Sequence, residues 1–295
     1  MSATPLPRSG KVTITGILEK KQQHQPITCL TAYDYPTSRL VDEAGIDMVL
    51  VGDSLAMVVL GYENTLSVTM EEMLHHTRAV RRAVKKALVI ADMPYASYHV
   101  DEKEAVANAL RFIKEAGAEA VKVEGGEKRV DLIKRLLDAE IPVMGHIGLT
   151  PQSINRMGGF KVQGKTLAAI ESLMRDAVAL DRAGVFSLVL EGIPREVASM
   201  ITEEVEAPTI GIGAGPECDG QVLVIHDLLN LSFHPAAKFI RQYADAAALI
   251  GQALQNFRSD VEARLFPFDG ESYHLPKETQ AALETIRARK RAMIR

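Results

Sequence analysis

Short apolar runs that end on turn residues recur along the whole chain. Residues 48–54 read MVLVGDS, an apolar run that stops at Gly52, Asp53 and Ser54. A run of this length, closed by a turn signal, predicts a buried β-strand of a parallel sheet. Runs of the same kind occupy the segments 27–34, 87–92, 120–124, 142–149, 187–191, 208–215 and 222–226. The pattern therefore predicts a set of buried parallel strands.

Helical segments alternate with these runs. One begins at about Pro36 and ends at Gly45, with proline in its first turn and glycine as its C-cap. Another opens on the capping residue Thr69, which two acids follow, and closes on the basic run 78–86. Further helices are expected at 14–21, 101–117, 166–183 and about 235–257. Strands that alternate with helices in this way predict an α/β fold, a (β/α)8 TIM barrel.

The chain shows no Pro- or Ser-rich linker that would divide the barrel. We expect a flexible N-terminal tail over 1–11, a single catalytic barrel domain over 12–260 and a C-terminal extension over 261–295. The extension is predicted to be helical from about residue 276, where a basic amphipathic pattern begins. A solvated or subunit-packing helix explains that pattern better than a nucleic-acid contact does.

Composition narrows the class of protein. The 295 residues carry a formal net charge of −4, which leaves no electrostatic footprint for nucleic acid. No apolar run approaches the roughly 20 residues of a membrane span, and the N-terminus has no secretion or import pattern. Cys29 and Cys218 show no ligand spacing and are interpreted as buried or incidental thiols. We expect a cytoplasmic protein that binds small molecules rather than nucleic acid or membranes.

Acidic residues stand at the ends of several predicted strands. They are Asp53, Asp92, Glu124 and Glu191. In a (β/α)8 barrel the C-terminal ends of the strands converge on one face, and active sites are built there. Lys122 lies two residues before Glu124, hence on the same face of its strand, and His146 lies near the end of the fifth strand. One mouth of the barrel is therefore predicted to collect these side chains.

Such a cluster of acids requires compensation. Several carboxylates cannot be ionised close together without a cation or a raised pKa. A hard divalent ion with oxygen ligands removes the conflict, and Mg²⁺ is the usual choice where few carboxylates and several waters complete the coordination shell. Any one strand-end aspartate is equally well explained as a helix N-cap. The repetition on separate strands favours the metal site.

Three features allow more than one interpretation. Lys122 can form a Schiff base with a ketone, can stay protonated beside an enolate oxygen, or can simply pair with an acid. His146 can be a metal ligand, a hydrogen-bond donor to substrate or a buried histidine with satisfied partners. The glycine-rich segment 211–215 indicates either close approach of a ligand or tight packing at the barrel end.

A succession of motifs resembles one known family. The segments are TAYDYPTSRL, LVGDSLAM, ADMPY, VKVEGGE, GHIGLTPQS, GGFKVQGK, LVLEGIP and IGIGAGPECDGQVLV, in that order. Together they resemble the ketopantoate hydroxymethyltransferase family, of the phosphoenolpyruvate mutase/isocitrate lyase barrel superfamily. The resemblance runs from about residue 12 to about residue 274.

The resemblance implies a reaction and a site. A one-carbon unit would pass from 5,10-methylenetetrahydrofolate to 3-methyl-2-oxobutanoate, through a Mg²⁺-stabilised enolate, giving 2-dehydropantoate for pantothenate synthesis. The family's Mg²⁺ ligands fall on Asp53 and Asp92, with Glu124 as a further acidic residue of the metal site. Its substrate contacts fall on Asp53, Ser54, Asp92 and Lys122, and its proton acceptor on Glu191. The resemblance also implies a homodecamer.

Some points depart from the family or lie outside it. Ala56 stands where the family often has glycine, and no role is transferred to the tail after His274 or to folate-binding residues. One rival function is a Mg²⁺-dependent aldolase or lyase that acts on another 2-oxo acid. A second rival is a barrel without catalysis that binds a metabolite or serves assembly. The acids together with Lys122 argue against the second rival.

Overall fold

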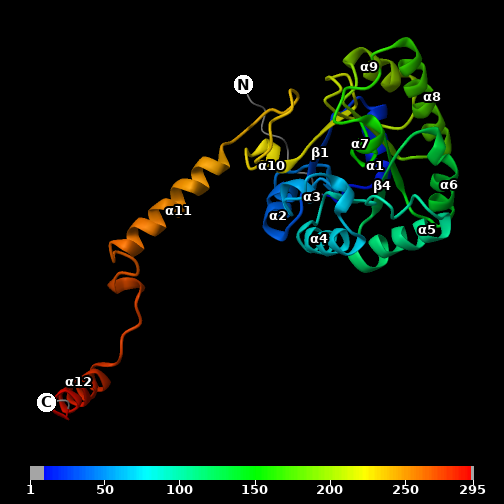
Figure 1. Cartoon of the computed structure of the whole chain (residues 1–295). Helices are drawn as coiled ribbons and strands as arrows, with labels where there is room; N and C mark the ends of the chain where they lie inside the picture. The colour runs from blue at the N-terminus through cyan, green and yellow to red at the C-terminus, as the bar shows by residue number, and fades with distance from the viewer. Residues whose placement is uncertain (1–9, 294–295) are drawn as a thin grey trace. The chain divides into compact units, whose positions relative to one another are not determined.

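Parallel strands close into a barrel in sequence order in the computed structural model, which describes residues 10–293 (Figure 1). The strands are β1 (Ile27–Thr31), β2 (Met48–Val51), β3 (Leu88–Asp92), β4 (Ala120–Glu124), β5 (Val143–Gly148), β6 (Ser187–Glu191), β7 (Thr209–Ile212) and β8 (Gly220–Leu223). Backbone pairing between β1 and β8 completes the ring. The predicted (β/α)8 barrel is confirmed.

Helices surround the barrel. The longer ones are α2 (Tyr35–Glu43), α4 (Met70–Ala83), α5 (Glu102–Arg111), α6 (Val130–Asp138), α8 (Leu167–Ala183) and α9 (Arg195–Glu204). Helix α1 (Ile14–Gln22) precedes β1, and its Ile17 joins the apolar cluster inside the ring. In Figure 1, α4, α5, α6, α8 and α9 follow one another around the outside of the ring. Short helices α3 (Leu55–Val58), α7 (Ile154–Met157) and α10 (Ile225–Leu228) follow β2, β5 and β8. The connections at the C-terminal end of the barrel are therefore partly helical.

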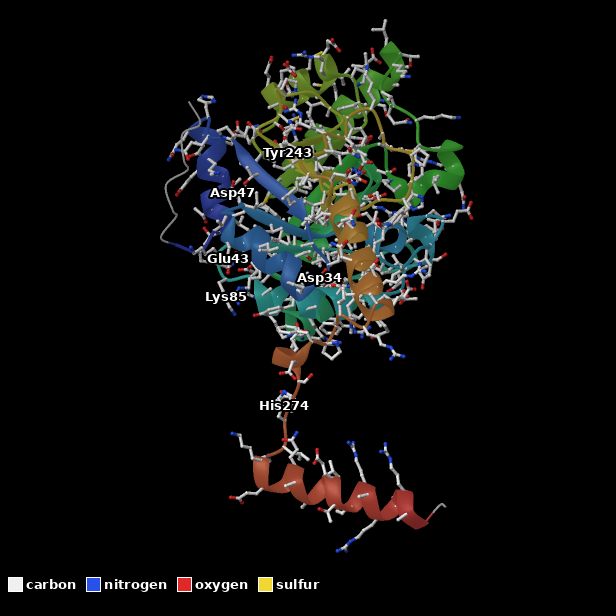
Figure 2. All side chains as sticks on the ribbon, turned by 90° about the vertical axis from the view of Figure 1, so that its left-hand side faces the viewer. Asp34, Glu43, Asp47, Lys85, Tyr243 and His274 are labelled. Carbon is white, nitrogen blue, oxygen red and sulfur yellow. The ribbon has the colours of Figure 1, made fainter. Side chains whose placement is uncertain are left out.

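Local signals set where these helices begin. Thr69 and Glu72 form a reciprocal capping box at the start of α4. Asp34 caps α2, because its Oδ1 accepts a hydrogen bond of 2.8 Å from the backbone N–H of Thr37. Asp34 and Glu43 mark the two ends of that helix in Figure 2. The acid that follows β1 is thus explained as the N-cap of α2.

The interior of the barrel changes character along its axis. Leu88 and Ile90 on β3, and Ala120 on β4, belong to one buried apolar cluster inside the ring. Side chains alternate between the two faces of a strand, so Asp92 and Lys122 continue the same inward-facing rows. The interior is therefore apolar toward the N-terminal ends of the strands, and the charged residues lie at the C-terminal ends.

Two segments differ from the sequence-based prediction. Strand β8 begins at Gly220, two residues early, because glycine at this position lets the backbone approach β1; a Cβ there would lie 2.4 Å from the carbonyl oxygen of Ile27. The predicted helix 235–257 is wrong over its first part, since α11 (Ala246–Glu262) begins after Asp245, which caps it. Residues 235–240 instead contribute to the wall of a cavity.

The chain divides into two compact units, one ending at Ala244 and one over 245–295. We therefore propose Ala244 rather than residue 260 as the end of the barrel domain. The second unit contains α11 and α12 (Lys277–Met293), with the rings of Phe257 and Phe266 5.5 Å apart. Among residues 10–293, no helix is long and apolar enough to cross a membrane.

Candidate active site

A cavity of about 250 Å³ opens at the C-terminal ends of the strands. Its wall contains every site residue predicted from the sequence, namely Asp53, Ser54, Asp92, Lys122, Glu124, His146 and Glu191. The structure thus brings together residues from β3, β4, β5 and β6 and from the turn after β2. Convergence at this face is what the barrel topology predicts.

Strand register places the charged residues beside one another. Asp92 on β3 is paired with Lys122 on β4, and Asp92 Oδ1 lies 3.0 Å from Lys122 Nζ. Glu124 is paired in the same way with His146 on β5. Because backbone hydrogen bonds fix this register, the positions of the charged groups are set by the sheet itself.

The turn after β2 supplies Asp53 and Ser54. The backbone N–H of Asp53 donates to Asp92 Oδ2 at 2.9 Å, which ties the turn to β3. The Ser54 hydroxyl lies 2.8 Å from the hydroxyl of Tyr33, a fully buried residue after β1. Gly52 is needed here because a Cβ at this position would lie 2.8 Å from Ser54 Oγ. Ser54 is therefore held in a fixed orientation at the edge of the cavity.

Burial and mutual repulsion control the protonation of the acids. Asp53, Asp92 and Glu124 are each at least 95% buried. Burial, and then the charges of Asp92 and Glu124, raise the pKa of Asp53 well above its usual value. Burial would lower the pKa of Lys122, but the surrounding carboxylates, Asp92 above all, raise it above its usual value. Lys122 is therefore a buried, protonated cation.

His146 connects the two sides of the cavity. Its Nδ1 lies 3.2 Å from Lys122 Nζ and 3.4 Å from Glu124 Oε1, and its Nε2 lies 3.2 Å from Glu191 Oε2. Burial and Lys122 would lower the pKa of His146, but the carboxylates of Glu124 and Glu191 raise it to about 9. Glu191 is the more accessible acid, since its side chain is 17% exposed.

The donor set fits a divalent cation that keeps much of its own shell. Three buried carboxylates face Lys122 and His146, and Glu124 Oε1 is buried without a hydrogen-bond partner among the described residues. Within the same part of the chain, no three or more His, Cys, Asp or Glu side chains form a ready ligand group. An ion here would take most of its ligands from substrate oxygens and water, which is the habit of Mg²⁺.

Two aromatic side chains stand at the outer wall of the cavity. Phe160, in the long connection before α8, is 51% exposed, and Phe239, in the segment before α11, is 38% exposed. Gly213 has a φ of +62°, and a Cβ on it would lie 2.7 Å from the Phe239 ring. The glycine-rich segment 211–215 therefore makes room for another part of this chain, which agrees with the packing interpretation.

The sequence analysis missed Gln152, which lies in the turn after β5. It is 95% buried and contacts Asp53, Glu124 and Tyr98. A glutamine does not titrate and pairs with many partners, so the sequence does not reveal its contacts. The available signal is a polar residue in the connection that follows β5, a strand that carries the site residue His146.

Most of the chain is similar to proteins of a known family. The family model described as "Ketopantoate hydroxymethyltransferase" matches residues 11–269. The chain is 73% identical over 283 residues to a 3-methyl-2-oxobutanoate hydroxymethyltransferase of Koribacter versatilis (strain Ellin345), covering 96% of each chain. That similarity spans nearly the full length of both proteins.

Solved structures share the fold at low sequence identity. A phosphonopyruvate hydrolase in complex with oxalate and Mg²⁺ gives a TM-score of 0.55 at 14% identity, covering 96% of this chain and 99% of its own. A 2,3-dimethylmalate lyase, described as a member of the PEP mutase/isocitrate lyase superfamily, gives 0.54 at 16%, with coverages of 95% and 98%. Both comparisons support the architecture.

Proposed function

Because this chain belongs to the ketopantoate hydroxymethyltransferase family, we propose that it transfers a hydroxymethyl group to 3-methyl-2-oxobutanoate. The product is 2-dehydropantoate, an intermediate of pantothenate synthesis, and the one-carbon donor is 5,10-methylenetetrahydrofolate. The observation that carries the proposal is the cavity in which Lys122 and the buried acids face the more accessible Glu191. An enolate reaction needs positive charge near the keto oxygen, which Lys122 supplies, and a base near the C3 proton, which Glu191 supplies.

The buried side of the cavity binds the 2-oxo acid. Asp53 and Asp92, with Glu124 beside them, are the residues that would hold Mg²⁺. Bound there, the ion would supply positive charge that makes the C3–H of the 2-oxo acid more acidic and stabilises the enolate. The Ser54 hydroxyl, oriented by Tyr33, donates to the substrate carboxylate, and Lys122 Nζ donates to the keto oxygen.

The accessible side performs the proton transfer. Glu191 takes the C3 proton, and the negative charge that results on the enolate oxygen is stabilised by protonated Lys122. His146 Nε2, 3.2 Å from Glu191 Oε2, orients the base. The enolate carbon then forms a bond to the methylene carbon of the donor as the bond from that carbon to N10 breaks. Water replaces N5 on the same carbon and supplies the hydroxyl oxygen. The C3 proton held by Glu191 and one proton of the water pass to the two nitrogens of tetrahydrofolate, which leaves.

The resemblance also supports two statements about the protein in the cell. The family typically assembles as a homodecamer, and we propose the same assembly here. A cytoplasmic location agrees with a folate-dependent biosynthetic step. Both proposals can be checked, by analytical ultracentrifugation of the purified protein and by fractionation of its host.

An endpoint assay tests the function. Protein, 3-methyl-2-oxobutanoate, methylenetetrahydrofolate and Mg²⁺ are incubated with and without EDTA, and 2-dehydropantoate is measured by mass spectrometry. We expect product with metal and none with EDTA. Loss of the C3 proton in D₂O without product would keep the enolate chemistry and reject the folate donor. Neither product nor exchange would reject the proposed reaction.

A further inference from the structure

Gln152 occupies a central position among the buried acids. Its side-chain Nε2 donates to Asp53 Oδ2 at 2.9 Å and to the carbonyl oxygen of Met93 at 3.0 Å. Its backbone N–H donates to Glu124 Oε2 at 3.0 Å. One residue therefore holds one oxygen of Asp53 and one oxygen of Glu124. Among the described residues, the other oxygen of Glu124, Oε1, accepts no hydrogen bond, although His146 Nδ1 lies 3.4 Å from it.

The orientation of the Gln152 amide is fixed by its partners. The Tyr98 hydroxyl donates to Gln152 Oε1 at 2.6 Å and accepts from the backbone N–H of Glu124 at 3.1 Å. The carbonyl oxygen of Met93 can only accept, so the NH₂ end must point toward Met93 and Asp53. Tyr98 is 3% exposed and Gln152 5% exposed, so water does not compete for these bonds.

We infer that Gln152 is a positioning residue, which fixes the rotamer of Asp53 so that its second carboxylate oxygen serves the metal and the substrate. This inference rests on the proposed function, since Asp53 acts there on a Mg²⁺-bound 2-oxo acid. Without the amide, Asp53 would face Asp92 and Glu124 with no neutral donor on its side chain. Rotation of Asp53 away from its present position would then remove a ligand. Outer partners of this kind typically change metal affinity 10- to 100-fold.

Gln152 contacts Glu124 and Asp53 through different groups. The bond to Glu124 comes from the backbone and persists in any variant except proline, whereas the bond to Asp53 comes from the side chain. A side-chain substitution therefore tests the anchoring of Asp53 alone. Gln152→Met keeps the length and removes the donor. Gln152→Glu keeps the shape and places an acceptor against the acceptors Asp53 Oδ2 and the Met93 carbonyl.

Metal binding is the readout that a merely structural role would not move. Free Mn²⁺ is measured by electron paramagnetic resonance during titration of each protein in saturating 3-methyl-2-oxobutanoate. We expect Kd for Mn²⁺ to rise 10- to 100-fold in Gln152→Met and at least as much in Gln152→Glu. Gln25, an exposed glutamine before β1, provides matched controls, and Gln25→Met and Gln25→Glu should bind Mn²⁺ as the parent does.

A milder variant keeps the test decisive if the larger changes reduce folding. Tyr98→Phe removes the hydroxyl that fixes the amide but leaves the donor in place, and should raise Kd about threefold to tenfold with a Tm near that of the parent. A crystal structure of the folded variants should show Asp53 Oδ2 moved from its present position. Kd within threefold of the parent in Gln152→Met and Gln152→Glu, with Asp53 unmoved, would overturn the inference.

The experiment also separates this inference from the proposed function. Parent protein that binds Mn²⁺ with the 2-oxo acid but forms no 2-dehydropantoate would reject the reaction, while the ratio of Kd values would still decide the role of Gln152. In protein that does turn over, the Gln152 variants should raise KM for the 2-oxo acid and the Mg²⁺ requirement more than they lower kcat at saturation. A fall in kcat alone would contradict a positioning role.

Discussion

Asp47 and Asp53 flank the same strand, β2, and are both buried, but their surroundings are opposite. Asp47, at the N-terminal end, is 0% exposed, and its Oδ2 accepts from Lys20 Nζ at 2.7 Å and from the backbone N–H of Thr28 at 2.8 Å. Asp53, at the C-terminal end, is 4% exposed and faces two further carboxylates. Asp47 therefore has a cation of its own, whereas Asp53 shares the charge of Lys122 with Asp92 and Glu124.

The difference shows which buried charges contribute to stability and which to function. A buried acid that pairs with a cation and with backbone donors holds neighbouring segments together. Loss of one partner lowers the free energy of unfolding. Where buried acids outnumber the nearby cations, they destabilise the folded protein unless a ligand supplies positive charge. Clusters of buried charge that destabilise the folded protein are typical of functional sites. The C-terminal end of this barrel has that character.

The largest effect should come from Glu191→Gln. This change removes the base but keeps the shape of the side chain, so kcat should fall about 10²- to 10⁴-fold while Mn²⁺ and the 2-oxo acid still bind. Stopped assays for 2-dehydropantoate give kcat, and the Mn²⁺ titration gives binding. Exchange of the C3 proton in D₂O should fall by the same factor. Retention of most of the activity would remove Glu191 from the base role.

A matched pair of substitutions tests the two ends of β2 directly. Asp47→Asn should lower the free energy of unfolding by about 3 kcal/mol, because Lys20 loses its buried counter-charge. Asp53→Asn should leave stability equal or higher, because repulsion among the acids is reduced, and should weaken binding of Mn²⁺ in the presence of the 2-oxo acid. Urea unfolding of both variants measures the contrast. Equal loss of stability at the two positions would contradict the distinction between the two ends.

The pH dependence of stability offers a third test, through His146. Its pKa in the folded protein is about 9, above its ordinary value of 6.5, so the folded state binds this proton more tightly than the unfolded chain does. The resulting stabilisation, up to about 3 kcal/mol, is complete below pH 6.5 and is lost as pH rises through 9. Thermal unfolding in EDTA should show this loss, and His146→Gln should flatten the profile. A parallel profile in the variant would exclude His146 as its source.

The smallest effect should come from Asp34→Ala. Asp34 ends the first apolar run, as Asp53 ends the second, but it caps α2. Its removal should cost about 1 kcal/mol of stability and leave kcat unchanged, whereas Asp34→Asn should preserve the cap. Urea unfolding with a parallel activity assay checks both. A large loss of turnover in Asp34→Ala would place this residue in the site after all.

The sequence predicted the barrel because strand apolarity and helix capping agree along most of the chain. It predicted the charged side of the site because strand ends converge by topology, so no contact had to be known. It failed where a contact decides the outcome. Gln152 has no titratable signature, and the segment 235–240 lines the cavity although its composition permits a helix. Asp34 and Asp53 look alike in sequence, and only packing separates a cap from a site residue.

Fixed strand register has a consequence for how this scaffold can diversify. Asp92 with Lys122, and Glu124 with His146, are locked by the barrel's own backbone ladder, while Phe160 and Phe239 belong to connecting segments. In the proposed reaction, replacing those connections would change which electrophile reaches the enolate, while Glu191 and Lys122 would stay in place. The charged residues of the site and the aromatic residues of its outer wall therefore belong to separate parts of the fold. New donor specificities are best sought by grafting loops, with the acids and the lysine left as they are.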